Sequence, residues 1–474
     1  MKHTDIIQKL NLEQKCALLS GETVFTTRAL PGKGIPAITL SDGPNGVRKQ
    51  AGAADHLGLN PSVPATCFPT SSATACSWDE KLGEAVGEAL GEEAAAQEVA
   101  VLLGPGLNIQ RSPLCGRDFE YFSEDPILAG RMAAAYVRGI QKNGISACPK
   151  HFAVNSQELR RMASDSVLDE RTLRELYLTG FEIVVKEAKP KTIMTSYNLI
   201  NGTYANENAH LLQDILRKDW GFDGAVVTDW GGSNDHALGV KNGSTLEMPC
   251  PGGDSIRELM KAVQDGKISE ADVDARLDEM LELVLSTHAA VEKAPRTFDA
   301  AAHHKLARRA AAESIVLLKN EGGILPLKPN EKLAVIGDFA ETPRYQGAGS
   351  SAVNALQVDT LLDSIKADDS GITLVGYASG FERQGAADAE KLEEAVALAK
   401  KADTVLLCLG LDELRESEGL DRSDMKLAEN QQQLLAAVAA VNPNVVVLLS
   451  AGAPIETPWA GQCRALVYGA LGGQ

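Results

Sequence analysis

The chain has 474 residues, which is too long for one small domain and typical of two or three domains. Hydrophobic residues make up 44% and charged residues 23%, an ordinary balance for a soluble globular protein. The formal net charge of -18 argues against nucleic acid and anionic membranes as partners, because both attract basic surfaces.

Residues 1–290 alternate short apolar runs with helical patterns, which is the βαβα rhythm of an α/β fold. Helices are predicted at 79–98, 169–186, 206–220 and 270–285; the second of these begins with an acidic N-cap, Asp169. The predicted strands are PAITLS, VLLGPGLNI, GISACPK, TIMTSYN and GAVVTDW.

The chain changes character after these elements. The segment STHAAVEKAPRTFDAAAHH is poor in apolar residues and contains a proline, so we predict a linker at 291–312. A second α/β unit is predicted at 313–474, with strands KLAVIGD, TVLLCLG, NVVVLLSAG and RALVYGA. A doubly wound sheet normally adds a covering helix after its last strand. Since the sequence stops at Gln474, we expect this unit to be incomplete at its C-terminus.

The cysteines and the apolar segments predict a compartment. Eight cysteines are scattered along the chain with neither a CxxC pair nor a Cys/His cluster of metal-ligand spacing. The first residues, MKHTDIIQKLNLEQK, do not resemble a signal peptide, and no apolar segment is long enough to span a membrane. We expect a cytoplasmic enzyme with reduced thiols and no metal.

Each of the five predicted strands in residues 1–290 leads to polar or ionisable residues. In a (β/α)8 barrel the carboxyl ends of all strands converge on one face, where active sites lie. A single aspartate at a strand end is about as often a helix N-cap, but five such ends together favour a site. The residues concerned are Asp42, Arg117, the pair Lys150 and His151, Tyr197 and Asp229.

These side chains suit a sugar. Several cations and carboxylates can hydrogen-bond an array of hydroxyl groups, and Trp230 offers an apolar face on which a sugar ring can stack. Neither a metal cage nor a phosphate cradle is evident. The glycine-rich segment YQGAGSSAVN lacks both the GxGxxG spacing and a Walker lysine, which argues against a nucleotide-binding protein.

Several motifs together carry a family resemblance. The segments SDGPNGVR, CGRDFEYFSEDP, KHFAVNSQELRR, TSYNLING and VVTDW, followed by LKNEGGILPL and SEGLDRSDMKL, resemble glycoside hydrolase family 3 of the β-glucosidase type. The resemblance covers essentially the whole chain, with the motifs in the family's order. It implies a (β/α)8-like barrel at 1–290 followed by an α/β sandwich at 313–474, with the active site between them and no cofactor. Such proteins usually extend beyond YGALGGQ and often add a third domain, so we expect this chain to be a fragment.

The resemblance also assigns roles. Asp229 of TDW matches the nucleophile. In DELRESEGLDR, Glu418 best matches the acid/base pattern GEGYDR, although Ser417 replaces its glycine; Glu416 and Glu413 are the alternatives. The residues that match sugar-binding positions are Asp42, Arg117, Lys150, His151, Arg161, Tyr197 and Trp230.

The implied activity is retaining hydrolysis that releases terminal non-reducing β-D-glucose from a small β-glucoside or oligosaccharide through a covalent glycosyl-enzyme. We expect Lys150, Arg117 and His151 to keep Asp229 ionised. We expect Glu418 to have a raised pKa suited to an acid. The alternatives are a β-xylosidase or α-arabinosidase of the same family and a sugar-binding fragment without turnover. The motif KHFPGHG, typical of the family's N-acetylglucosaminidases, is absent, and a homo-oligomer is compatible with the sequence.

Overall fold

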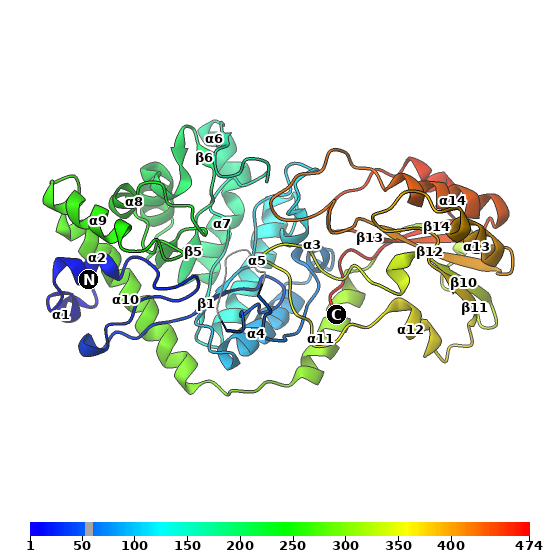
Figure 1. Cartoon of the computed structure of the whole chain (residues 1–474), viewed down its shortest axis with the longest axis horizontal. Helices are drawn as coiled ribbons and strands as arrows, with labels where there is room; N and C mark the ends of the chain where they lie inside the picture. Colours follow the sequence, from blue (N-terminus) through cyan, green and yellow to red (C-terminus); the bar gives the residue numbers. More distant parts are fainter. Residues whose placement is uncertain (53–59) are drawn as a thin grey trace.

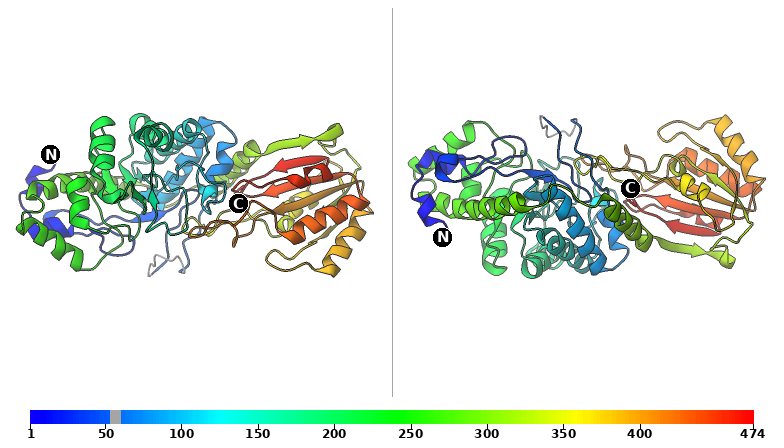
Figure 2. Two further views of the ribbon diagram at one scale, coloured as in Figure 1. Left: turned by 90° about the horizontal axis from the view of Figure 1, so that it is seen from above. Right: turned by 90° about the horizontal axis from the view of Figure 1, so that it is seen from below.

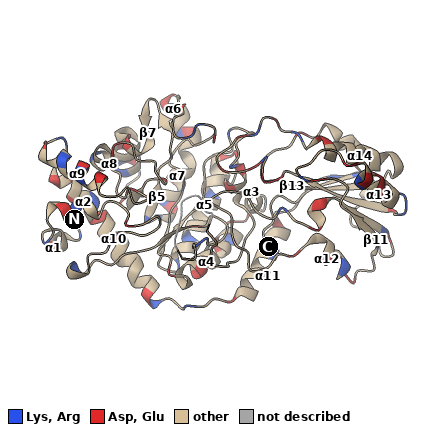
Figure 3. Ribbon diagram, viewed as in Figure 1, with Lys and Arg blue, Asp and Glu red and all other residues tan. Residues whose placement is uncertain are grey.

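The computed structural model describes residues 1–52 and 60–474. The molecule is elongated, with an N-terminal part (residues 1–314) at one end and a C-terminal part (residues 315–474) at the other (Figure 1). The last residue, Gln474, lies between the two parts, where its side chain accepts a hydrogen bond from Cys67 N (Figure 1). Basic and acidic residues are interspersed along the chain in both parts (Figure 3).

Short parallel strands form the centre of the N-terminal part. One parallel sheet has the order β1 (Leu40–Asp42), β2 (Val101–Leu103), β3 (Ser146–Ala147), and a second pairs β5 (Thr192–Met194) with β8 (Ala225–Val227). Parallel bridges join Phe152 to Thr195, Val227 to Leu246, and Ser20 to Glu247; antiparallel bridges then lead back through Thr26 to Thr39, next to β1. The five predicted strands are thus confirmed. They belong to two small sheets joined by bridges, so a regular eight-stranded barrel stays a prediction.

Helices surround these strands. The helical prediction at 79–98 is confirmed by α4, and that at 270–285 by α10, which continues to Lys293. The predictions at 169–186 and 206–220 correspond to helical segments that contain π-helical turns. The helices are α1 (Thr4–Ile7), α2 (Leu12–Ala17), α3 (Ser71–Ala75), α4 (Glu80–Ala96), α5 (Pro126–Gln141), α6 (Glu170–Thr172), α7 (Thr179–Ile183), α8 (His236–Asn242), α9 (Asp254–Gln264), α10 (Glu270–Lys293) and α11 (Ala300–Ser314), with π-helical segments at Leu173–Tyr177, Val184–Ala188 and His210–Asp219. A small sheet of β4 (Asp165–Ser166), β6 (Leu199–Ile200) and β7 (Thr203–Tyr204) and 3-10 turns at Pro31–Lys33, Asp118–Glu120 and Ala205–Glu207 complete this part.

The C-terminal part is built on one six-stranded sheet, visible face-on in Figure 2. The sheet order is β11-β10-β12-β13-β14-β9, in which β9 is an antiparallel edge strand and the other five strands run parallel. Near-continuous apolar runs such as TVLLCLG are typical of strands buried on both faces. The elements are β9 (Val316–Asn320), β10 (Lys332–Ile336), α12 (Leu361–Lys366), β11 (Thr373–Ala378), α13 (Ala389–Ala399), β12 (Thr404–Gly410), α14 (Glu429–Val441), β13 (Val445–Ser450) and β14 (Ala465–Tyr468), with 3-10 turns at Glu321–Gly323, Asp338–Ala340 and Pro458–Gln462. The predicted α/β class is confirmed for both parts.

The connection between the two parts is largely helical. The segment predicted as a linker, 291–312, includes most of α11, whose first turn is capped by the Asp299 side chain. Ala307 and Ala310 on α11 are buried against the N-terminal core, which explains why a segment with few large apolar residues is still ordered as a helix. Separate hydrophobic clusters fill the two parts.

Candidate active site

The predicted site residues converge where the strands of the N-terminal part end. Asp42 is the last residue of β1, Lys150 and His151 follow β3, and Asp229 lies two residues after β8. Lys150, Arg117 and Arg161 all lie close enough to Asp229 to alter its pKa, as does Glu418 from the C-terminal part. Within residues 1–52 and 60–474, no three His, Cys, Asp or Glu side chains gather as a metal site would require.

The two carboxylate oxygens of Asp229 differ in their hydrogen bonding among the described residues. The residue is 9% exposed; Oδ1 accepts a hydrogen bond from Trp230 N at 2.7 Å, and Oδ2 lies 3.6 Å from His151 Nε2. Oδ2 is buried and has no hydrogen-bond partner among the described residues. Burial raises the pKa of Asp229, and the positive charges of Arg117, Arg161 and Lys150 oppose that rise.

His151 does not supply the positive charge that we expected. Burial, together with Arg117, Lys150 and Arg161, lowers the pKa of His151 well below its ordinary value, so the ring is neutral. The residue is fixed at its backbone by Asn108, which accepts from His151 N at 2.7 Å and donates to His151 O at 2.9 Å. Its Nδ1 lies 3.1 Å from the Tyr121 hydroxyl. A neutral, fixed imidazole beside Asp229 suits a hydrogen-bonding role.

Arg117 and Arg161 come from two different loops of the N-terminal part. Arg117 is 1% exposed and forms an ion pair with Glu120, while its Nη1 has no hydrogen-bond partner in the described structure. Arg161 lies over the Tyr197 ring at 4.7 Å from its centroid. The Arg161 Nη1 atom donates to Glu158 Oε2 at 2.7 Å and to Glu418 Oε1 at 2.8 Å, so it joins the two parts of the molecule.

An aromatic wall completes the N-terminal side of the site. The Tyr197 hydroxyl donates to Trp230 O at 2.9 Å, and the indole Nε1 of Trp230 donates to Val24 O at 2.7 Å. The Trp230 and Phe25 rings lie 5.3 Å apart. The indole is therefore held in one orientation while it stays only partly buried.

Glu418 is brought to this site by the loop between β12 and α14. Its Oε2 accepts from Ser350 N at 2.7 Å, and its Oε1 lies 3.6 Å from Arg117 Nη1 in addition to the bond from Arg161. Although burial raises the pKa of Glu418, the cations of Arg117 and Arg161 outweigh burial and hold that pKa well below its ordinary value. The expectation of a raised pKa was wrong for the protein without substrate, because Arg161 donates a hydrogen bond to the Glu418 carboxylate and Arg117 forms an ion pair with it.

The two alternative glutamates lie elsewhere. Glu416 is completely buried, accepts from Gly452 N at 3.2 Å and lies 3.7 Å from Arg344 Nη2. Burial raises the pKa of Glu416. Glu413 forms an ion pair with Arg383 at 3.2 Å. Of the three, only Glu418 contacts the arginines around Asp229.

Sequence reasoning missed several residues that build the site. Glu158 bridges Arg161 to Gly419 N, at 2.7 and 2.8 Å, and stands in the quoted segment KHFAVNSQELRR. Ser350 stands in YQGAGSSAVN, which we considered only as a nucleotide loop. Arg48 donates to the carbonyl oxygen of Ser350 at 2.9 Å and so holds that loop against the N-terminal part.

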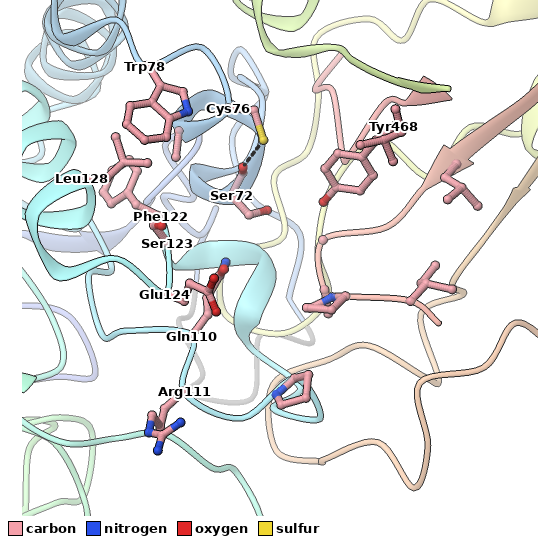
Figure 4. Close-up of a pocket in the computed structure, with 18 of the residues that line it drawn as sticks. Ser72, Cys76, Trp78, Gln110, Arg111, Phe122, Ser123, Glu124, Leu128 and Tyr468 are labelled. Carbon is pink, nitrogen blue, oxygen red and sulfur yellow. Dashed lines mark hydrogen bonds between the residues drawn. The ribbon is translucent and has the colours of Figure 1, made fainter. Parts of the chain in front are cut away.

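A separate cavity of about 700 Å³ lies between the two parts (Figure 4). Its walls include Trp78 and Phe122 from the N-terminal part and Tyr468 from β14. None of the predicted site residues lines it. The site around Asp229 is therefore distinct from this cavity.

Carboxylates and arginines gathered at strand ends, between two α/β units, are features of a carbohydrate-active enzyme, and the sequence comparisons define the family. Residues 48–283 match the glycosyl hydrolase family 3 N terminal domain, and residues 315–474 match the glycosyl hydrolase family 3 C-terminal domain. The chain belongs to glycoside hydrolase family 3.

Similar proteins carry related names. The chain is 46% identical over 473 residues to thermostable beta-glucosidase B of Acetivibrio thermocellus, covering 99% of this chain and 62% of that protein. It is 44% identical over 480 residues to an exo-alpha-(1->6)-L-arabinopyranosidase of Bifidobacterium longum, covering 99% and 63%. The chain thus spans less than two thirds of both relatives.

Solved structures show the same fold. The GH3 beta-glucosidase of Bifidobacterium adolescentis superimposes with a TM-score of 0.92 at 42% identity, over 99% of this chain and 67% of that one. Beta-glucosidase 3B of Thermotoga neapolitana, in a structure with glucose, gives a TM-score of 0.90 at 32% identity, over 100% of this chain and 72% of that one.

Proposed function

We propose that this chain carries the active site of a retaining β-glucosidase, with Asp229 as nucleophile and Glu418 as acid/base. The observation that carries the proposal is a pair of buried atoms without hydrogen-bond partners in the described structure, Asp229 Oδ2 and Arg117 Nη1. Buried polar groups are normally paired, so such atoms at one site await a ligand that donates and accepts, as sugar hydroxyls do.

In the first step, Asp229 Oδ2 attacks the anomeric carbon and the leaving oxygen takes a proton from Glu418. The resulting ester is then hydrolysed by water, from which Glu418 removes a proton. Glu418 is paired with Arg161 in the free protein and therefore ionised. Substrate must weaken this pair, because a carboxyl that loses its cation partner regains the pKa of an acid.

The sugar-binding roles follow from position. We propose that Asp42, Lys150, His151, Arg161 and Tyr197 bind hydroxyl groups and that Trp230 packs on the ring. Burial raises the pKa of Asp42 to about 6, with Glu418 and Asp229 adding to the rise and Lys150 and Arg48 opposing it. A buried carboxyl group whose pKa is shifted in this way is typical of a functional site.

A second candidate is hydrolysis of pentopyranosides, either β-xylosides or α-L-arabinopyranosides. It is favoured by the 44% identity to the arabinopyranosidase of Bifidobacterium longum. A pentopyranoside lacks the hydroxymethyl group at C5, so the two activities differ in the space around that carbon. A third candidate is a sugar-binding fragment without turnover.

One set of assays separates these functions. We expect the highest kcat/KM on nitrophenyl β-D-glucoside, with the xyloside and the α-L-arabinopyranoside slower and Asp229→Asn inactive on all three. Faster pentoside cleavage would support the second candidate. Glucose binding by calorimetry without turnover would support the third, and neither binding nor turnover would refute the proposal.

We also propose a (β/α)8-like barrel at 1–290 and an α/β sandwich at 313–474. The barrel is supported by the bridges that lead from β8 through residues 246–247 and 20–27 back to β1. A cytoplasmic location is supported by eight cysteines that are all free, since disulfides are rare in reducing compartments. Among the described residues, no helix is both long and apolar enough to cross a membrane.

A further inference from the structure

Asp421, three residues after Glu418, ties the C-terminal part to two loops of the N-terminal part. Its Oδ1 accepts from Gly116 N at 3.2 Å and from Glu158 N at 2.9 Å. Its Oδ2 accepts from Glu158 N at 3.1 Å and from Leu159 N at 2.9 Å. Hydrogen bonds to an ionised carboxylate are stronger than those between neutral groups, so this is a firm attachment between loops more than 250 residues apart.

The two loops that Asp421 holds are the loops that carry the site arginines. Gly116 directly precedes Arg117, and Glu158 stands three residues before Arg161. The Glu158 side chain continues the connection, because its Oε2 accepts from both Arg161 Nη1 and Gly419 N. The chain that follows Glu418 is therefore held at two points: Gly419 N donates a hydrogen bond to the Glu158 side chain, and the Asp421 carboxylate accepts from the N–H groups of the two loops.

The loop at Gly116 packs closely against the backbone of residues 417–420. A Cβ atom at Gly116 would lie 1.8 Å from Leu420 O and 2.3 Å from Ser417 O. The two backbones thus touch directly on either side of Glu418. A shift of the loop at Asp421 therefore changes the backbone contacts on either side of Glu418, and displaces the Glu418 carboxylate with them.

We infer that Asp421 is a positioning residue for the reaction proposed above, and the inference rests on the role given there to Glu418. Its carboxylate holds residues 417–421 against the loops that carry Arg117 and Arg161, and so keeps the Glu418 carboxylate at the site that these loops form. Both Asp421 oxygens are occupied by main-chain N–H groups, so Asp421 acts through the loop and has no oxygen left for the substrate.

Asp421→Asn tests this role with little change in shape. The amide keeps one acceptor oxygen and turns a donor toward N–H groups, so at least one of the present bonds is lost. A displacement of about 1 Å in a catalytic group costs about 100-fold in rate. We expect kcat/KM to fall about 100-fold on an alkyl β-glucoside, whose leaving group needs a proton. On dinitrophenyl β-glucoside, which departs without a proton, the fall in the glycosylation rate should be less than about threefold.

Asp424→Asn is the matched control. Asp424 stands in the same loop, and its contacts stay within the C-terminal part, with Lys426 N at 2.8 Å and Arg415 Nη1 at 3.9 Å. We expect wild-type rates on both substrates. Glu418→Ala is measured alongside and should show the same selective loss as Asp421→Asn, but a larger one.

The outcomes separate this inference from the proposed function. If Glu418→Ala shows no dependence on the leaving group, the acid/base role fails and the inference fails with it. If Glu418→Ala behaves as expected but Asp421→Asn slows both substrates equally, or neither, only the positioning role is overturned. Should Asp421→Asn lose its cooperative thermal transition, Asp421→Glu replaces it, since the added methylene group keeps the charge and displaces the same loop. A uniform loss in Asp421→Glu overturns the inference, and a selective loss supports it.

Discussion

The raised pKa of Asp42 allows a quantitative test of whether this binding residue lowers the free energy of unfolding of the protein. Its pKa is raised from 3.8 to about 6 in the folded protein, chiefly by burial. The folded protein therefore keeps a proton between about pH 4 and pH 6 that the unfolded chain has released. Stability from this group falls as pH rises through that window. A shift of about two units corresponds to about 3 kcal/mol, which is fully lost at pH 7.

Asp42→Asn removes the titration and keeps the shape. We expect the free energy of unfolding at pH 7 to rise by up to about 3 kcal/mol, and the difference from wild type to vanish near pH 4. Urea unfolding at the two pH values measures both quantities. On the same samples, kcat/KM for nitrophenyl β-D-glucoside should fall strongly, because the charged acceptor for a hydroxyl is gone.

A destabilised Asp42→Asn protein at pH 7, with unchanged kcat/KM, would refute this reasoning and make Asp42 a structural residue. A matched control is Asp165→Asn, an exposed aspartate at the start of β4 and outside the site, which should keep the kcat/KM of wild type.

Three further predictions concern the reacting groups. Asp229→Asn should lower kcat about 10³-fold or more in steady-state assays while the thermal transition stays at or above that of wild type, because an amide oxygen can still accept the hydrogen bond from Trp230 N; activity within tenfold of wild type would remove Asp229 as nucleophile. In Glu418→Ala, azide should accelerate breakdown of the glycosyl-enzyme from dinitrophenyl β-glucoside, since azide needs no general base; rescue in Glu416→Ala instead would move the role to Glu416. Arg161→Met removes the cation 2.8 Å from Glu418 and should raise the pKa of that carboxyl, so the pH profile of kcat/KM should move to higher pH. The same movement in Arg160→Met, a change at an exposed neighbouring residue, would argue against a role for the Arg161–Glu418 pair.

The strands and the α/β class were predictable because apolar runs and helical spacing are local signals. The same holds for the convergence of Asp42, Lys150 and Asp229, since parallel strands bring their carboxyl ends to one edge. The ionisation of Glu418 was not predictable. Its pKa depends on Arg117 and Arg161, which stand 301 and 257 residues earlier in the chain. The spacing of apolar residues in a sequence does not indicate how closely such distant loops approach each other. For the same reason, the hydrogen bonds of Asp421 could not be predicted.

Helix α11 shows that composition, a local signal, can also mislead. The segment was predicted as a linker because it is poor in apolar residues and contains a proline, whereas its small side chains are what allow α11 to lie against α3 and α4. Composition alone does not distinguish a solvated connector from a helix that packs closely.

The division of the site between two parts has a consequence for synthesis of the protein. Glu418 follows Asp229 by 189 residues, and ribosomes add about 5–20 residues per second, so the second carboxylate emerges about 10–40 s after the first. During that interval the nascent chain holds the proposed nucleophile without the proposed proton donor. Under the proposed mechanism, hydrolysis of substrates with poor leaving groups begins only after the C-terminal part has been made and has docked, so its onset would time the assembly of the two parts during synthesis.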